Sequence, residues 1–365
     1  MKIECSVEKL KNAISQAERV TGKNLTLPIL SSILMIASGK SLKLRATNLS
    51  LGIEVEIPAK VEMEGVAAIR GDVVSTLFGA LQSGDQVVVE LINDNLSVVT
   101  KHNRSLIKNY SHEDFPTIPI VNGQSFVMPA KKVVEGIRSV SYSSAISDIK
   151  PEISSIYIYP DGEDIVFVAT DAFRLAEKRI KIKKIEDFQG ILIPFKNVAE
   201  IIRLLGDHDG DVTVSFTKNQ LSFTFPGVYI TSRIIDGIFP DYKQIMPKGH
   251  ETEVIVLKQD LLNALKLSNI FSDKFNQITL FVDPANKVFS VRSKNADVGE
   301  NETNVLASQK GEAVEINLNH RYFLDCFSSV SADSVVIHFN GVSKPMIVKG
   351  LSDNSFTYLV MPINR

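Results

Sequence analysis

The sequence predicts an α+β fold built from three tandem copies of one module, each with two helices packed on antiparallel sheet. The first observation is a long internal repeat. "SSILMIASGKSLKLRATNLSLGIEVEI" begins at Ser31 and "SSIYIYPDGEDIVFVATDAFRLAEKRI" begins at Ser154, and the two align without a gap. A third copy with the same pattern, "NQITLFVDPANKVFSVRSKNADV", begins at Asn276. The second observation is that the segments flanking these copies repeat too.

Each repeated stretch is typical of a β-hairpin, with an alternating strand, a turn and a second strand. The turns read "ASGKS", "PDGED" and "DPANK". Within the alignment, Ala46-Thr47-Asn48 matches Ala169-Thr170-Asp171. We therefore expect the same local structure at both strand ends.

An amphipathic helix precedes each hairpin, and a second helix with a further hairpin follows it. In the first helix, Val7, Leu10, Ile14 and Ala17 form one apolar face. The six helices are predicted over 7–19, 72–82, 129–140, 194–205, 258–269 and 319–329.

Matching linkers close the first two copies and mark domain boundaries. "HEDFPTIPIVNG" spans 112–123 and "GIFPDYKQIMPKG" spans 237–249, both rich in Pro and Gly. We place the modules at 1–122, 123–248 and 249–365. Equal modules in series imply pseudo-symmetry, which favours an arc or a ring.

Composition indicates a soluble, cytoplasmic protein. Hydrophobic residues make up 44% of the 365 residues, and the net charge of −2 excludes a grossly basic nucleic-acid binder. Cys5 and Cys326 have no partner spacing, so neither a disulfide framework nor a zinc site is expected. The N-terminus lacks a signal-peptide core, and the apolar segment 27–39 is too short to span a membrane.

Catalytic and metal-binding motifs are not apparent, so we expect a non-enzyme without cofactor or metal. The six histidines are not spaced as a metal pair. "GDHDGD" (206–211) resembles the start of a calcium loop but lacks its final Glu, and it matches a helix-to-strand turn in the repeat. Asp171 has Asn48 at its repeat equivalent, which favours a strand-end residue bonding nearby backbone over a catalytic carboxylate.

The predicted helices carry an excess of positive charge. They contain eleven basic and seven acidic residues, a net charge of +4, so the rest of the chain carries −6. A mixed, solvated helix surface explains this excess, and so does a helical surface that faces a polyanion without reading its sequence. The basic residues are Lys9, Lys11, Arg19, Lys131, Lys132, Arg138, Lys196, Arg203, Lys258, Lys266 and Arg321.

Three tandem modules with four ordered motifs resemble the bacterial DNA polymerase III beta subunit family, the sliding clamps. The motifs are "LTLPILSSILM" (25–35), "ATDAFRLA" (169–176), "FPDYKQIMP" (239–247) and "VMPINR" (360–365). The resemblance implies that two chains join head to tail into a ring around duplex DNA, with helices lining the hole. It implies as partners a second copy of the chain, double-stranded DNA, the polymerase III catalytic subunit, a clamp loader, translesion polymerases and mismatch-repair proteins.

The resemblance also implies a groove for short peptides between the second and third modules. Adaptable methionines and apolar residues suit a groove that accepts a Leu or Phe anchor from many partners. Arg174 would either bond a peptide carbonyl or pack its stem on the floor. The segment "DIKPEISS" (148–155) departs from the family at Pro151 and Glu152. The groove residues implied are Ile153, Thr170, Ala172, Phe173, Arg174, Leu175, Pro240, Ile245, Met246, Pro247, Val360, Met361, Pro362, Ile363 and Arg365.

For the ring, the resemblance pairs Ile270 and Phe271 with Leu106 and Ile107 of the partner chain; the alternative is that Ile270 and Phe271 fill their own core. Near DNA it suggests Lys23, unless this is an ordinary loop lysine. The remaining DNA-facing candidates are Lys9, Lys11, Lys131, Lys132, Arg138, Lys196, Arg203, Lys258 and Lys266. Two other functions stay open: a repeat scaffold that binds proteins without encircling DNA, and a hydrolase around Asp171 and Arg174.

Overall fold

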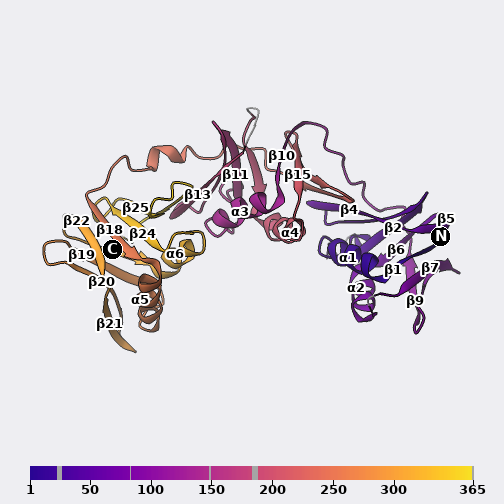
Figure 1. The fold of residues 1–365 in the computed structure, drawn as a ribbon, viewed down its shortest axis with the longest axis horizontal. Coiled ribbons are helices and arrows are strands. Elements are labelled where there is room, and N and C mark those ends of the chain that lie inside the picture. Colours follow the sequence, from indigo (N-terminus) through magenta and orange to yellow (C-terminus); the bar gives the residue numbers. More distant parts are fainter. Residues whose placement is uncertain (23–26, 83, 148, 183–187, 364–365) are drawn as a thin grey trace. The chain divides into compact units, whose positions relative to one another are not determined.

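The chain forms two compact units in a computed structural model (Figure 1). One unit comprises 1–131 with 199–234, and the other comprises 132–198 with 235–365. The structure describes every residue except 23–26, 83, 148, 183–187 and 364–365. Lys23 and Arg365 therefore lie outside the described residues.

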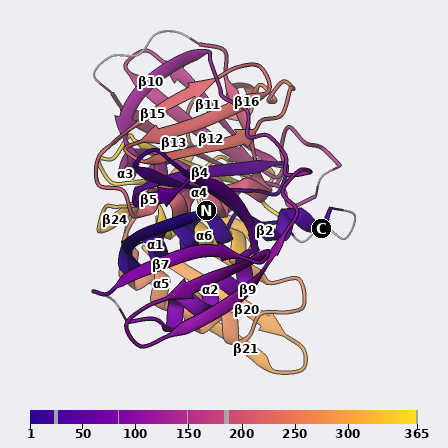
Figure 2. The ribbon, with the colours of Figure 1, turned by 90° about the vertical axis from the view of Figure 1, so that its right-hand side faces the viewer.

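The first unit contains one sheet of 13 described strands, in the order β10-β15-β16-β17-β4-β3-β2-β6-β9-β8-β7-β1-β5. The pairing order places β10 at one edge of this sheet, followed by β15 and β16, which are labelled in Figure 2. Its strands are β1 (Lys2–Ser6), β2 (Ser32–Ser38), β3 (Ser41–Thr47), β4 (Leu51–Pro58), β5 (Lys60–Met63), β6 (Gly65–Arg70), β7 (Gln86–Ile92), β8 (Asn95–Val99), β9 (Arg104–Tyr110), β10 (Gln124–Pro129), β15 (Asp211–Phe216), β16 (Gln220–Phe225) and β17 (Val228–Arg233).

The second unit contains two sheets among its described residues. The larger has the order β14-β11-β12-β13-β26-β25-β24-β18-β22, and the smaller β21-β20-β19-β23. Their strands are β11 (Ser155–Asp161), β12 (Asp164–Thr170), β13 (Arg174–Lys181), β14 (Ile191–Pro194), β18 (Thr252–Leu257), β19 (Gln277–Asp283), β20 (Val288–Asn295), β21 (Gly299–Asn304), β22 (Ala307–Gly311), β23 (Val314–Asn319), β24 (Ser334–Phe339), β25 (Met346–Gly350) and β26 (Phe356–Val360).

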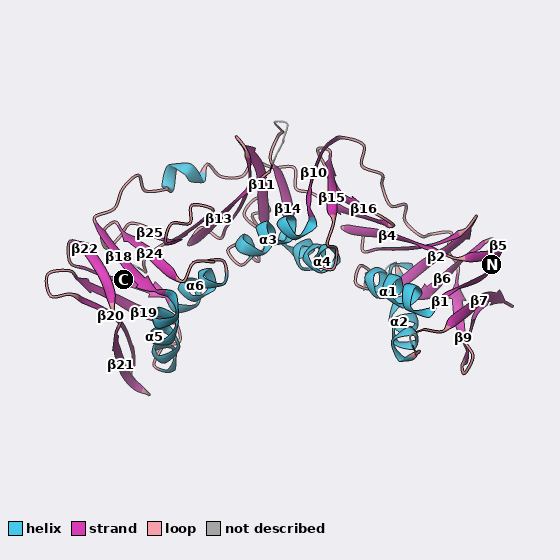
Figure 3. Cartoon of the chain, in the orientation of Figure 1, coloured by secondary structure: helices cyan, strands magenta, loops and turns pink. Residues whose placement is uncertain are grey.

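All six predicted helices form, within a residue or two of the expected bounds except at one end. They are α1 (Val7–Glu18), α2 (Gly71–Ala80), α3 (Ala130–Ser141), α4 (Phe195–Gly206), α5 (Lys258–Ile270) and α6 (His320–Asp325). The last is shorter than predicted and continues as the 3-10 turn η3 (Cys326–Ser328). In the first unit α1 lies beside α2, and in the second α5 lies beside α6 (Figure 3). The apolar face predicted for α1 is fully buried.

The three repeated hairpins are confirmed. β2 pairs with β3, β11 with β12, and β19 with β20, all antiparallel. The turns at Gly39, Gly162 and Lys287 have positive φ of 61°, 65° and 56°. Glycine takes this conformation without strain, and the third copy adopts it with lysine.

The apolar segment 27–39 folds into the 3-10 turn η1 (Pro28–Ser31) and strand β2. Among the described residues, the helices are all too short or too polar to cross a membrane. "GDHDGD" joins the end of α4 to the start of β15, as the repeat predicts, and Asp209 forms an ion pair with Lys131 at 2.7 Å.

Two helical glycines give opposite stability predictions. A Cβ at Gly136 in α3 would lie 2.4 Å from the Phe167 ring, whereas a Cβ at Gly79 in α2 would meet nothing within 4 Å. Gly136→Ala should lower the free energy of unfolding by about 1–2 kcal/mol, because overpacking outweighs the gain in helix propensity. Gly79→Ala should raise it by about 0.5–1 kcal/mol. Urea unfolding of both variants tests this; the same sign for both would contradict the packing at Gly136.

Candidate functional site

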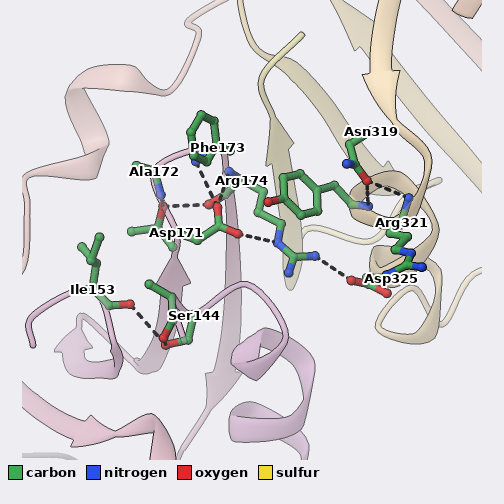
Figure 4. Close-up of polar contacts among 12 residues, drawn as sticks. Ser144, Ile153, Asp171, Ala172, Phe173, Arg174, Asn319, Arg321 and Asp325 are labelled. Carbon is green, nitrogen blue, oxygen red and sulfur yellow. Dashed lines mark hydrogen bonds and ion pairs between the residues drawn. The ribbon is translucent and has the colours of Figure 1, made fainter. Parts of the chain in front are cut away.

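The turn between β12 and β13 is fixed by its own side chains (Figure 4). Thr170 Oγ1 donates to the carbonyl of Arg174 at 2.7 Å and accepts from the amide of Ala172 at 3.1 Å. Asp171 Oδ1 accepts from the amides of Phe173 and Arg174, both at 3.0 Å. Ala172 has φ of 76°. These bonds hold the next residue, Phe173, at the surface, where its side chain is 61% exposed.

The first copy repeats this turn bond for bond between β3 and β4. Thr47 Oγ1 donates to the carbonyl of Leu51 at 2.9 Å and accepts from the amide of Leu49 at 3.0 Å. Asn48 Oδ1 accepts from the amides of Ser50 and Leu51 at 3.0 and 2.8 Å, and Leu49 has φ of 73°. Asp171 and Asn48 thus bond nearby backbone, as the sequence predicted.

The second copy adds an ion-pair network around Arg174. Its Nε donates to Asp171 Oδ2 at 2.9 Å, and its Nη1 donates to Asp325 Oδ2 at 2.6 Å. The guanidinium also stacks over the Tyr322 ring, 4.2 Å from its centroid. Burial works against the charge, but the bonds to Asp325 and Asp171 raise the pKa of Arg174 above its usual value. With its side chain 11% exposed and two carboxylates bound, Arg174 packs as a support for the turn rather than as a free donor.

The strand after this turn pairs with the last strand of the chain. Arg174 to Lys178 in β13 lie opposite Val360 to Phe356 in β26, and the amide of Met361 extends the ladder by donating to the carbonyl of Phe173 at 2.8 Å. The amide of Ile363 then donates to the carbonyl of Asn317 at 2.7 Å. The "ATDAFRL" and "VMPINR" segments, remote in sequence, are therefore neighbours.

An apolar cluster lies under these segments. Leu175, Leu359, Phe239 and Tyr242 are buried in it, and Met246 and Met361 pack against it with part of their surface exposed. Val360 is fully buried and lies between β13 and β25, so it belongs to the sheet interior rather than to an open surface. Thr170 and Pro362 are also buried, while Pro240 and Ala172 are exposed.

The 3-10 turn η2 (Tyr242–Ile245) is anchored to the sheet through Tyr242. Its hydroxyl donates to Glu177 Oε2 and shares a 2.7 Å hydrogen bond with the Tyr159 hydroxyl. Burial and the neighbouring Glu177 raise the pKa of Tyr242, so it remains a neutral donor. This anchor leaves Ile245 51% exposed beside the half-buried Met246 and Pro247. The three also line a surface hollow of about 440 Å³.

The segment ahead of β11 holds Ile153 through its backbone. The Ile153 carbonyl accepts from the Ala145 amide at 3.0 Å and from Ser144 Oγ at 3.2 Å, and its side chain is half-buried (Figure 4). Pro151 is exposed and Glu152 is half-buried.

The candidate DNA-facing residues differ in how they are engaged. Lys132 pairs with Glu135 and Arg203 with Glu200, both at 2.7 Å, as Lys131 does with Asp209. Lys11 and Lys258 donate to the backbone carbonyls of Gly79 and Val330. Within the described part of the chain, an exposed set forms no ion pair: Lys9, Arg138, Lys196 and Lys266.

Two of the four candidate interface residues present apolar surface. Leu106 on β9 is 63% exposed and Ile270 at the end of α5 is 61% exposed, so Ile270 does not fill its own core. Ile107 is buried at 8%, and Phe271 is half-buried.

Family models match nearly the whole chain in order. The N-terminal, central and C-terminal domains of the DNA polymerase III beta subunit match residues 1–119, 127–241 and 243–364. The chain belongs to the DNA polymerase III beta subunit family. Members of this family are non-catalytic processivity clamps, so the hydrolase alternative around Asp171 and Arg174 falls away.

Named relatives and solved structures agree over their full length. The beta sliding clamp of Synechococcus elongatus is 26% identical over 100% of this chain and 99% of its own, and that of Synechocystis sp. is 25% identical over 100% and 99%. The sliding clamp of Bacillus subtilis superposes with a TM-score of 0.95 at 21% identity, covering 100% of this chain and 99% of that one. A Pseudomonas aeruginosa clamp bound to griselimycin gives 0.95 at 23% identity, with both chains covered 100%.

Several residues of the groove region were not singled out from the sequence. Asp325 and Tyr322 contact Arg174 from α6, and Tyr159 and Glu177 fix Tyr242. The repeat could have indicated that Arg174 needs a partner specific to the second copy. Leu51 stands at the equivalent position of the first copy, and an uncharged residue needs no counter-charge.

Asp171 variants test the assignment of this turn as scaffold. Asp171→Asn keeps a side-chain oxygen that accepts from both backbone amides, as Asn48 does. It removes the negative charge that pairs with Arg174. It should lower the free energy of unfolding by about 1–3 kcal/mol. Asp171→Ala removes the amide acceptors too and should cost more. Urea unfolding measures both, and an equal cost would contradict the backbone role of Oδ1.

Proposed function

We propose that this chain is half of a closed ring, a head-to-tail homodimer that encircles duplex DNA and tethers the replicative polymerase. The modules are 1–122, 123–248 and 249–365, and the protein works in the cytoplasm. Its partners are the polymerase III catalytic subunit, a clamp loader, translesion polymerases and mismatch-repair proteins. Membership of the beta subunit family supports this proposal. The alternative of a repeat scaffold that does not encircle DNA would leave this membership unexplained.

The observation that carries the partner-binding part is the apolar region around the β13–β26 pair. Half-exposed Met246 and Met361 pack on a buried floor that includes Leu175, Leu359 and Phe239. Exposed Ile245 precedes Met246 in the chain, and the carbonyl of exposed Phe173 accepts from the amide of Met361. Such a surface suits an extended peptide with one large apolar anchor. Two methionines allow it to adapt to anchors of different shape.

DNA binding in this proposal is electrostatic and weak. The unpaired cations Lys9, Arg138, Lys196 and Lys266 are few. Three further candidates, Lys131, Lys132 and Arg203, are partly neutralised by internal carboxylates, and Lys11 and Lys258 are bound to backbone carbonyls. Weak contacts to phosphate allow sliding, because the closed ring and not the affinity prevents escape. For the ring contact we propose exposed Leu106 of one chain against exposed Ile270 of the other.

Ile245→Lys tests the groove. The substitution should weaken binding of a fluorescent peptide ending in Leu-Phe by about tenfold or more, because it places a charge where the anchor seats. Ile245 is 51% exposed, so folding should be unaffected. Leu306→Lys, at a side chain 89% exposed elsewhere in the same unit, is the matched control. Fluorescence anisotropy measures both, and an unchanged affinity for Ile245→Lys would move the peptide site elsewhere.

Topological retention tests the ring. The clamp, once loaded by a clamp loader, should remain on nicked circular DNA through gel filtration and should be lost when the same DNA is linearised. Retention should survive salt that disrupts simple phosphate binding. Equal retention on the circular and linear forms would sink the encircling mechanism while leaving the groove intact.

A further inference from the structure

A cluster of two histidines and a glutamate lies on the larger sheet of the second unit, outside the groove floor. Strand pairing places Glu253 of β18 directly opposite His338 of β24. His250 stands two residues before β18, and its ring stacks on that of His338 with centroids 4.0 Å apart and an interplanar angle of 8°. The two histidines are 88 positions apart in the sequence, which explains why sequence spacing gave no sign of a metal pair.

The ligand atoms of this cluster lie close enough together to share one metal ion. Glu253 Oε2 lies 3.3 Å from His338 Nε2 and 3.8 Å from His250 Nε2. One nitrogen or oxygen from each residue falls within 4.8 Å of the other two. Tetrahedral zinc with bonds of about 2.0–2.1 Å separates its ligand atoms by about 3.4 Å. The His250 side chain is exposed, so it is free to adjust toward a shared cation.

The electrostatic surroundings of His338 favour its neutral imidazole. Burial and the adjacent His250 lower the pKa of His338, although Glu253 opposes this. Lys310 lies opposite Glu253 on β22, and Lys349 on β25 repels a charged His338. The nearby Glu251 is paired with Lys344 at 3.3 Å. The single carboxylate of Glu253 is thus the negative charge aimed at the cluster.

We propose that His250, Glu253 and His338 form a binding site for a divalent transition cation of the zinc class. Two imidazoles and one carboxylate supply three ligands, and water completes a tetrahedral shell. Imidazole nitrogen selects zinc and similar ions over magnesium and calcium, which prefer all-oxygen shells.

A bound cation would link two parts of the chain. It would hold the segment that precedes β18, through His250, against strand β24, through His338. His250 lies in the stretch after η2, whose own residues line the 440 Å³ hollow together with His250. Cation binding stabilises the folded state by mass action, since the unfolded chain does not present the three ligands together.

Calorimetric titration of the full, tag-free chain with zinc chloride at pH 7.5 tests the site. The expected result is one site per chain, with affinity lowered tenfold or more in His338→Gln and in Glu253→Gln. Binding should weaken as the pH falls toward 5.5, because protonated imidazole is not a ligand. His208→Gln is the matched control, since His208 belongs to the first unit, where its ring stacks on Phe225.

Zinc should also raise the melting temperature of the wild-type chain and not that of the His250→Gln/His338→Gln variant. His250→Gln alone, at an exposed position before the strand, repeats the test should His338→Gln fail to fold. Equal zinc affinity of the wild type and the double variant would overturn the proposal. So would an equal loss in His208→Gln, or tighter binding of magnesium than of zinc.

Discussion

The backbone pairing of β13 with β26 is the contact on which the groove region depends. It brings the strand that follows "ATDAF" against the last strand of the chain, and it sets Met361 beside Phe173 through one further amide bond. The apolar cluster then fills the space beneath, with Leu175 and Leu359 as directly paired residues. Without this strand pairing, the surface side chains of the groove would not share one buried apolar cluster beneath them.

The first unit contains an equivalent strand pairing with different side chains. β4 pairs with β17, and the amide of Arg233 donates to the carbonyl of Ser50 as that of Met361 does to Phe173. There, Gly52 and Thr231 stand where the second unit has Leu175 and Leu359. The duplicated backbone thus supplies the frame twice, and side-chain differences alone make one copy apolar. One of these differences is Arg174, whose largely buried charge is compensated by Asp171 and Asp325.

Much of this was predictable from the repeat, and the remainder required tertiary contacts. Periodicity located all six helices, and the Asp171–Asn48 match correctly indicated a scaffold turn. The sequence did not predict how deeply Val360 is buried. The family resemblance names it as a groove residue, and in the structure its side chain is fully buried inside the sheet. The partners of Arg174 and the His250–Glu253–His338 cluster depend on side chains remote in sequence, and no local spacing encodes them. Exposure of Ile270 likewise depends on what packs over the end of α5.

The central claim is that two chains close a ring through exposed apolar residues at Leu106 and Ile270. β9, which carries Leu106, also has one edge that is largely unpaired among the described strands. Arg104 to Lys108 pair with β8 on one side, whereas on the other side only Asn109 and Tyr110 pair with β6. Light scattering of the purified protein tests the claim most directly. The account predicts twice the chain mass of 40.3 kDa, persisting on dilution. A stable monomer at that single mass would contradict it and favour a scaffold that binds proteins without encircling DNA.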